Sequence, residues 1–240
     1  MAKQNQKAIR FGILGCGLAA GFHADAIKSV DGAVLTGVYD ADPERSASFA
    51  AKYACRAYES FRDFAGSEEA DAVCVCTPSG LHAQGAVSLL ENGKHLLIEK
   101  PIAVDEAGAK TILAAAKRSG KTVGVVSQLR CCHDVRLLRS AIAAGELGDI
   151  VSVQLGMLYH RTETYYRNSS WHGTLVLDGG GALINQGIHG VDLLLWLLGP
   201  VKRVQGVKAT LLHDIEAEDT LCALMEFQSG CIGTLNAATS

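Results

Sequence analysis

The sequence lacks a long hydrophobic run: no apolar stretch approaches the roughly 20 residues that a membrane-spanning helix needs. Residues 1–7 are polar overall and lead straight into the first apolar stretch, so we expect no secretory signal peptide. A basic excess is also missing, because the formal net charge is −3, which offers little attraction to nucleic acid. These absences predict a cytoplasmic protein with neither a membrane nor a nucleic-acid partner.

The eight cysteines lack the spacing of metal ligands, since no Cys-x-x-Cys occurs. Cys74 and Cys76 alternate along one apolar run, Cys131 and Cys132 are adjacent, and the other four are scattered. We therefore expect reduced, mostly buried thiols and no metal site. The sequence also contains no internal repeat and no low-complexity linker, and its 240 residues suffice for one large or two modest domains.

A glycine-rich turn is the most informative feature that the sequence does contain. Gly15, Gly17 and Ala20 follow an apolar run directly, and a helical pattern opens behind them. In a dinucleotide-binding fold, Gly15 makes the tight turn, Gly17 lets the pyrophosphate approach, and Ala20 lets helix and strand pack closely. Asp40 ends the next apolar run, where a carboxylate accepts hydrogen bonds from the adenosine ribose. This order of motifs is more specific evidence than the glycines alone. The alternative to a dinucleotide-binding turn is an ordinary glycine-rich loop.

The turn and Asp40 predict NAD as the cofactor. A carboxylate suits two ribose hydroxyls and repels the 2′-phosphate of NADP, and neither Ala41 nor Asp42 supplies a cation. The remaining residues of the turn are expected to contact the cofactor as well: Cys16, Leu18 and Ala19.

Apolar runs alternate with helical patterns through residue 127. Strands are predicted at 72–76, 95–98 and 122–126, and helices over 81–92 and 105–118, with another beginning at Asp42-Pro43. This spacing predicts an α/β fold with a Rossmann-type doubly wound parallel sheet over residues 1–127.

After about residue 128 the pattern changes. A helix over 133–144 precedes long alternating runs, and one strongly apolar helix at 182–198 interrupts them. We expect an α+β domain over residues 128–240, with a mostly antiparallel, open sheet that carries helices on one face.

The runs at 221–225 and 231–235 place apolar side chains on both faces of that sheet. This predicts a homodimer or homotetramer in which the uncovered face is packed. The predicted strands lie at 150–158, 201–211, 220–227 and 231–237.

Polar residues follow the strands of the first half, at the edge where open α/β sheets bind ligands. Thr77-Pro78 and Glu99-Lys100 are therefore expected to converge with Asp40 at the cofactor. Lys100 is interpreted as the group that holds a substrate hydroxyl and stabilises its growing negative charge. A solvated surface lysine is the alternative. Glu99 is interpreted either as a partner of that lysine or as a solvated acid.

Two histidines of the first half have weaker interpretations. His82 lies in the first turn of the helix after Thr77-Pro78 and is expected to pack against the cofactor, with a capping or surface histidine as an equal alternative. His23 is expected to be a packed or exposed residue of the first long helix.

Asn185, His189 and Asp192 are spaced four and three residues apart in the apolar helix, which predicts a single polar stripe. Buried polar groups must be satisfied or used. One interpretation makes His189 the general base that takes the hydroxyl proton, with Asp192 orienting its ring. The other is a core histidine bonded to its helix neighbours, and the spacing does not decide between them.

Taken in order, these motifs resemble the Gfo/Idh/MocA family of glucose–fructose oxidoreductase, inositol dehydrogenase and rhizopine catabolism proteins. The resemblance covers essentially the whole chain. It rests on the glycine turn, Glu99-Lys100-Pro101, Gly145-Glu146-Leu147-Gly148 and the helix that runs from Gly179 to His189-x-x-Asp192. It implies that Lys100 and His189 flank the substrate carbon beside the nicotinamide. It also implies association through the second-domain sheet, and further strands beyond the position of Ser240, so that the sheet here is expected to be incomplete.

The stretch 165–174, followed by Asn185-Gln186, is similar to the subgroup that acts on UDP-N-acetylglucosaminuronate at carbon 3. Two positions depart from the pattern. The residue after the tryptophan is commonly arginine in that subgroup, and here it is His172, which removes a permanent cation. The family often has aspartate four residues before the catalytic histidine, and here Asn185 supplies a hydrogen-bonding group instead.

The motifs together predict an NAD-dependent oxidoreductase that moves a hydride between a secondary alcohol of a sugar or nucleotide sugar and the nicotinamide. The alternative is a non-catalytic dinucleotide-binding sensor or regulatory protein on the same fold, which would need neither Lys100 nor His189. Four residues are candidates for contacts with sugar hydroxyls, although each also has a structural interpretation: Asn185, Gln186, Tyr166 and Arg130.

Overall fold

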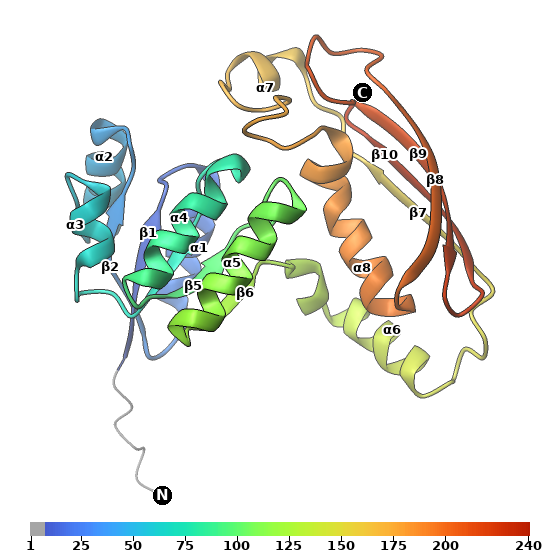
Figure 1. Ribbon diagram of the computed structural model, residues 1–240, viewed down its shortest axis with the longest axis horizontal. Coiled ribbons are helices and arrows are strands. Elements are labelled where there is room, and N and C mark those ends of the chain that lie inside the picture. The colour runs from blue at the N-terminus through green and yellow to red at the C-terminus, as the bar shows by residue number, and fades with distance from the viewer. Residues whose placement is uncertain (1–7) are drawn as a thin grey trace, which may run out of the picture. The chain divides into compact units, whose positions relative to one another are not determined.

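A computed structural model describes residues 8–240, which form two compact units, residues 8–126 and residues 127–240. Within the described residues, no helix is both long and apolar enough to cross a membrane. The first unit is α/β and the second α+β (Figure 1).

The first unit is built on one six-stranded parallel sheet. Its strands are β1 (Ile9–Leu14), β2 (Ala33–Tyr39), β3 (Arg56–Ala57), β4 (Ala72–Val75), β5 (His95–Ile98) and β6 (Val123–Val125). They pair in the order β3-β2-β1-β4-β5-β6. The connections change direction between β1 and β4, and ligands of doubly wound folds bind at this point, beyond the carboxyl ends of the strands.

Helices cover both faces of this sheet because neighbouring strand residues point to opposite sides. Ile13 and Cys74 belong to the apolar cluster beneath α1 (Leu18–Ser29) and α2 (Pro43–Tyr53). Leu14 and Val75 belong to the cluster on the other face. That face carries α3 (Phe61–Gly66), α4 (His82–Glu91), which follows the short turn η1 (Ser79–Leu81), and α5 (Glu106–Ser119).

Local capping explains where several of these helices begin. The Asp42 carboxylate accepts hydrogen bonds from Glu44 N and Arg45 N ahead of α2, and Asp105 caps α5 through Gly108 N. α1 differs, because Gly17 precedes it without a side-chain cap. The first N–H groups of α1 are therefore left for a ligand.

The second unit carries a four-stranded sheet in the order β7-β10-β9-β8. β10 pairs antiparallel with β9, and β9 with β8, whereas β7 and β10 are parallel. The sheet is therefore mixed and mostly antiparallel. Its strands are β7 (Ser152–Leu158), β8 (Val201–Ala209), β9 (Thr220–Phe227) and β10 (Ile232–Ala238). The helical segments are η2 (Gln128–Cys131), α6 (His133–Ala143), α7 (Glu163–Arg167), the π-helical turn η3 (Leu183–Gly187) and α8 (Ile188–Leu198).

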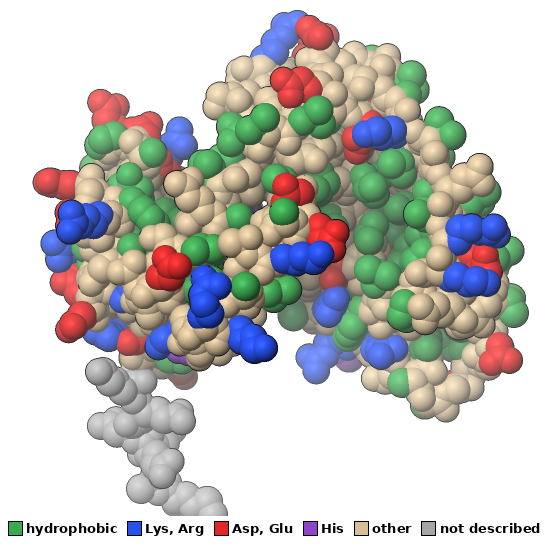
Figure 2. Space-filling view, in the orientation of Figure 1, with side chains coloured by type: hydrophobic (Ala, Val, Ile, Leu, Met, Phe, Trp, Pro, Cys, Tyr) green, Lys and Arg blue, Asp and Glu red, His purple; other side chains and the backbone are tan. Residues whose placement is uncertain are grey.

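α8 packs on one face of this sheet. Gly190 allows the approach, because a Cβ there would lie 2.4 Å from Leu155 Cδ2. Leu194 shares an apolar cluster with Met225 and Phe227 of β9, and hydrophobic side chains gather around α8 and the adjoining sheet in Figure 2. The opposite face of the sheet exposes apolar side chains to solvent: Leu158, Val207, Leu224 and Ile232.

The predicted fold class is confirmed, including the two kinds of sheet. The strands expected at 95–98 and 220–227 have those bounds in the structure. The helix expected over 182–198 is present, but its first turn is π-helical. β3, α3 and α7 were not predicted, because each is too short for a periodic pattern to develop.

Candidate active site

The glycine turn has the geometry that close approach of a ligand requires. Gly15 has φ +89°, and a Cβ there would lie 2.9 Å from the Cys76 carbonyl, so only glycine fits. Its N–H donates to Tyr39 O at 2.8 Å, which ties the turn to the end of β2. A Cβ on Gly17 would meet nothing within 4 Å. Open space therefore faces the uncapped N-terminus of α1, as a bound pyrophosphate requires.

Asp40 follows β2 directly and orders this turn. Its Oδ2 accepts from Cys16 N at 2.7 Å, and its Oδ1 accepts from Asp42 N at 2.9 Å. Each carboxylate oxygen can accept a second hydrogen bond, so the group can still bind ribose hydroxyls. The guanidinium of Arg45 lies 4.0 Å from Oδ2. Sequence reasoning missed this cation because it lies one helical turn beyond Ala41 and Asp42, the positions where a cation was sought.

Other atoms around the turn are consistent with a dinucleotide. Thr77 Oγ1 is buried without a hydrogen-bond partner among the described residues, and Leu18 is 84% exposed. A ligand at the strand ends would satisfy the first and cover the second. The backbone N–H of Cys16 donates to Asp40, and burial raises the pKa of the Cys16 thiol to about 12. Ala19 and Pro78 are half-buried. The residues present therefore fit an NAD-type cofactor.

Lys100 lies in the turn after β5, at the same edge of the sheet. The preceding residue holds this turn: Glu99 N donates to Val75 O at 3.0 Å, and Glu99 Oε2 accepts from Lys100 N at 3.2 Å. Glu99 Oε1 lies 2.8 Å from His23 Nε2. The Glu99 side chain is only 19% exposed, so its interpretation as a solvated acid is wrong. Burial opposes its ionisation, but the contacts with His23 and Lys100 together outweigh burial and lower the pKa of Glu99.

His82 is buried rather than on the surface, so the surface alternative is wrong. It is 1% exposed, and its ring nitrogens lie 2.8 Å from Pro101 O and 2.9 Å from Thr77 O. Burial lowers its pKa, although the two carbonyls oppose that shift. His82 thus joins the turns after β4 and β5, and its contact with the cofactor stays a prediction.

In the second unit, Asn185 lies in the π-helical turn η3 and His189 in the first turn of α8. The predicted stripe therefore crosses a change of helix type, a feature frequent at functional sites. Asn185 Nδ2 donates to both carboxylate oxygens of Asp178, at 2.8 and 3.0 Å, and its Oδ1 accepts from Gln186 Nε2. A buried carboxylate thus lies behind Asn185. Sequence reasoning did not find this role for Asp178.

A close backbone contact fixes the start of this segment. Ala182 N donates to Glu218 O at 2.8 Å, and a Cβ on Gly181 would lie 1.7 Å from that same oxygen. Only glycine allows this approach, which explains the small residues that precede the helix.

Asp192 is engaged by Arg130 from elsewhere in the same unit. Arg130 Nε and Nη2 donate to the two Asp192 oxygens at 2.7 and 2.5 Å, and the guanidinium lies over the Trp196 ring. The hydrogen bonds to Asp192 raise the pKa of Arg130. The structure therefore places both residues in a bidentate pair that joins η2 to α8. This pair favours the structural interpretation of each over sugar binding by Arg130 or ring orientation by Asp192.

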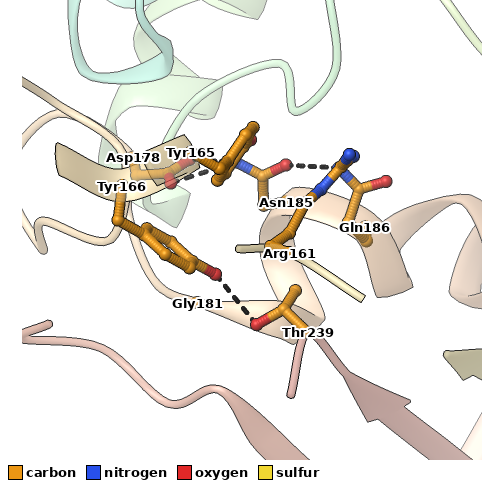
Figure 3. Close-up of a pocket in the computed structure, with 8 residues that line it drawn as sticks. All are labelled: Arg161, Tyr165, Tyr166, Asp178, Gly181, Asn185, Gln186 and Thr239. Carbon is orange, nitrogen blue, oxygen red and sulfur yellow. Dashed lines mark hydrogen bonds between the residues drawn. The ribbon is translucent and has the colours of Figure 1, made fainter. Parts of the chain in front are cut away.

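A small pocket of about 210 Å³, including its open mouth, lies beside Asn185 and Gln186 (Figure 3). Tyr166 donates from its hydroxyl to Thr239 Oγ1 at 2.8 Å. Arg161 extends along the pocket toward Gln186, and its Nε is buried without a hydrogen-bond partner among the described residues. No pattern in the sequence pointed to Arg161.

The Arg161 guanidinium lies 4.6 Å from the centre of the Tyr165 ring. Tyr165 in turn stacks on His172, with ring centres 4.3 Å apart. The ring of His172 therefore packs on Tyr165, and the Arg161 guanidinium supplies a cation next to the same ring.

Comparison with known proteins agrees with this geometry. Residues 9–127 match a family model described as "Oxidoreductase family, NAD-binding Rossmann fold", and residues 135–240 match the GFO/IDH/MocA C-terminal domain. The chain belongs to the Gfo/Idh/MocA oxidoreductase family. The resemblance inferred from its motifs is thereby confirmed.

Among solved Gfo/Idh/MocA structures, the chain is similar to the WlbA dehydrogenase of Bordetella pertussis in complex with NADH and UDP-GlcNAcA. The identity is 36%, the TM-score is 0.95, and the match covers 99% of this chain and 68% of that one. The Chromobacterium violaceum WlbA complex with the same two ligands gives 35% identity and a TM-score of 0.93, over 100% of this chain and 69% of that one. A curated relative, the scyllo-inositol 2-dehydrogenase (NADP(+)) IolU of Bacillus subtilis, is 34% identical over 89% of this chain and 65% of its own length.

Proposed function

We propose that this chain is an NAD-dependent dehydrogenase that oxidises a secondary alcohol of a nucleotide sugar. The proposal rests on one observation. Lys100 lies in a turn that the contacts of Glu99 hold in place, at the same sheet edge as a glycine turn whose geometry fits a dinucleotide. A protein that only senses a dinucleotide has no need of an amine in that place. The similarity to structures that contain NADH and UDP-GlcNAcA supports a nucleotide sugar as the substrate class.

The proposed mechanism gives the proton transfer and the charge stabilisation to different side chains. The glycine turn and Asp40 would hold NAD, which would supply the acceptor for the hydride of the carbinol carbon. His189 takes the hydroxyl proton as general base, a role that suits imidazole near neutral pH. Lys100 hydrogen-bonds the same oxygen and stabilises its developing negative charge. Asn185 and Gln186, ordered by Asp178, orient neighbouring sugar hydroxyls.

The proposal is tested by incubating the protein with NAD and a panel of sugars and UDP-sugars while NADH absorbance is followed. We expect NADH to form with one UDP-sugar and not with the corresponding free sugar. Tight NAD binding without NADH formation on any member of the panel would instead favour the sensor.

More specifically, we propose that the substrate is an acidic UDP-sugar of the N-acetylglucosaminuronate type, and that Arg161 contacts its carboxylate. Replacing Arg161 by glutamine keeps a planar donor but removes the charge. Because a hydrogen bond between charged groups contributes about 1.5–3 kcal/mol, we expect KM for the acidic sugar to rise about tenfold or more. KM for neutral UDP-N-acetylglucosamine should change little.

Arg167→Gln is the matched control for Arg161→Gln. Arg167 is exposed and pairs with Glu163 on its own helix, at 2.7 Å. We expect its kinetics to be those of the unmodified protein. An equal rise of both KM values in Arg161→Gln would remove Arg161 from recognition of the carboxylate.

We also propose a homo-oligomer, most simply a two-fold dimer, that packs the uncovered sheet faces together. Leu224 is 61% exposed in the middle of that face, and its neighbours across the sheet, Thr234 and Gln205, are uncharged. Light scattering should give at least twice the chain mass. Leu224→Glu should give the mass of one chain, whereas Leu113→Glu, on the exposed side of α5, should leave the assembly intact. A soluble monomer before any substitution would contradict this proposal.

A further inference from the structure

A chain of contacts links α1 to the backbone of Lys100. His23, which lies on α1 five residues after its first residue, approaches Glu99 with Nε2 2.8 Å from Oε1. The other oxygen of that carboxylate accepts from Lys100 N at 3.2 Å. Both side chains of the His23–Glu99 pair are largely enclosed, at 11% and 19% exposure. The helix that begins at the cofactor turn is thus connected to Lys100 in two steps.

The contact between His23 and Glu99 favours the ionised form of both groups. Burial disfavours the imidazolium, but hydrogen bonds to Cys74, Cys76 and Glu99 outweigh burial and raise the pKa of His23 to about 12. The pKa of Glu99 is lowered in the same contact. A buried carboxylate next to Lys100 is therefore compensated by a buried cation, and the two charges cancel locally.

We propose that His23 is a positioning residue for Lys100. It binds the Glu99 carboxylate from the side of α1, which holds the turn that carries Lys100 and compensates the negative charge next to the lysine amine. The inference rests on the function proposed above for Lys100. The proposal gives α1 two roles. Its N-terminus faces the cofactor, and its residue His23 affects how firmly the Lys100 amine holds its proton.

Loss of His23 would leave the Glu99 carboxylate uncompensated. Among the described residues, the titratable groups that act on this pair include the thiols of Cys74 and Cys76 and the Lys100 amine, and His82 lies beyond Glu99. Among these groups, the Lys100 amine is a cation, and Lys100 already contacts Glu99 through its backbone N–H. An opposite charge at close range raises the pKa of a lysine, so the amine would hold its proton more firmly and turn toward Glu99.

The test measures the amine itself. Lys100 is acetylated by a trace of acetic anhydride across a pH series, and the labelling midpoint of its peptide is read by mass spectrometry. The exposed Lys110 provides an internal reference in every sample. We expect His23→Ala to raise the Lys100 midpoint by about half a pH unit or more. The double variant His23→Ala/Glu99→Gln should return to the midpoint of the unmodified protein, because it removes both charges.

His95→Asn is the matched control. This histidine is exposed at the other end of β5, where its Nδ1 accepts from Thr122 N, and its loss should leave the Lys100 midpoint unchanged. If His23→Ala does not fold, as judged by circular dichroism, His23→Gln retains a donor to Glu99 and should raise the midpoint in the same direction.

An unchanged Lys100 midpoint in the His23 variant would overturn the proposal, and so would an equal rise in the single and double variants. The labelling needs neither substrate nor turnover, so failure of the proposed dehydrogenase function would be seen separately, in the NADH assay. Where turnover is measurable, we expect His23→Ala to lower kcat several-fold with little change in KM for NAD.

Discussion

Replacing Lys100 by alanine is expected to lower turnover by about 10²–10⁴-fold, and replacing His189 by alanine by a similar factor, as for other acid–base groups. NAD affinity should change little. The physical reason is that each side chain is proposed to act on charge or a proton that moves only during the reaction. Turnover is measured by NADH absorbance and NAD affinity by calorimetry.

Matched controls for these two variants are Lys110→Ala and His160→Ala. Lys110 is exposed and pairs with Glu106 on its own helix, at 2.6 Å, and His160 is exposed in the second unit. Neither control should alter turnover or NAD binding. Near-normal turnover in His189→Ala would show that this histidine is a structural core residue. A loss of NAD affinity as large as the loss of turnover would make Lys100 a cofactor ligand alone.

The second large effect concerns the choice between NAD and NADP. Titration should show clearly tighter binding of NAD, because the Asp40 carboxylate repels a 2′-phosphate. Asp40→Asn keeps an oxygen that can accept from Cys16 N but removes the charge, and it leaves the Arg45 guanidinium beside the ribose position. We expect the preference for NAD to fall about tenfold or more, a change of about 1.4 kcal/mol.

A second substitution separates the two charges. In Asp40→Asn/Arg45→Ala, the gain in NADP affinity should disappear, because the cation that would bind the phosphate is gone. Asp25→Asn, an exposed carboxylate on α1, should leave both affinities unchanged. Equal or tighter NADP binding by the unmodified protein would contradict the assignment of Asp40. The name of the NADP-dependent relative shows that members of the family differ in this choice.

The parts of the fold that were predictable depend on signals within a few residues. The glycine turn, the run that ends before Asp40 and the strand His95–Ile98 each have a local pattern bounded by turn residues. The end of a strand also places the residues that follow it, so the sequence alone predicts Lys100 at the ligand edge of the sheet.

The partners of the site residues were not predictable in the same way. Glu99 pairs with His23 across 76 positions of the chain, and Asp192 pairs with Arg130 across 62. Neither pair has a local signal, because the fold alone brings the partners together. Asp178 lies only seven residues before Asn185, but it precedes the helical segment, so the sequence pattern did not indicate their hydrogen bonds either.

The π-helical turn was also missed, for a different reason. Its residues have an ordinary helical pattern, and the widened turn coincides with the close contact between Gly181 and the Glu218 carbonyl. That constraint comes from the neighbouring segment rather than from the helix sequence. A spacing of four residues between Asn185 and His189 therefore indicated the right segment but not its local geometry.

Transfer of deuterium tests the central claim most directly. The protein is mixed with NAD and UDP-N-acetylglucosaminuronate that carries deuterium at carbon 3 of the sugar, and the nicotinamide product is examined by mass spectrometry after a single turnover. We predict NADH that carries one deuterium, together with a sugar product that has lost the deuterium of carbon 3 and the proton of its hydroxyl group. NAD that remains oxidised with this and every other UDP-sugar, in a protein that binds both ligands, would contradict the assignment of a dehydrogenase.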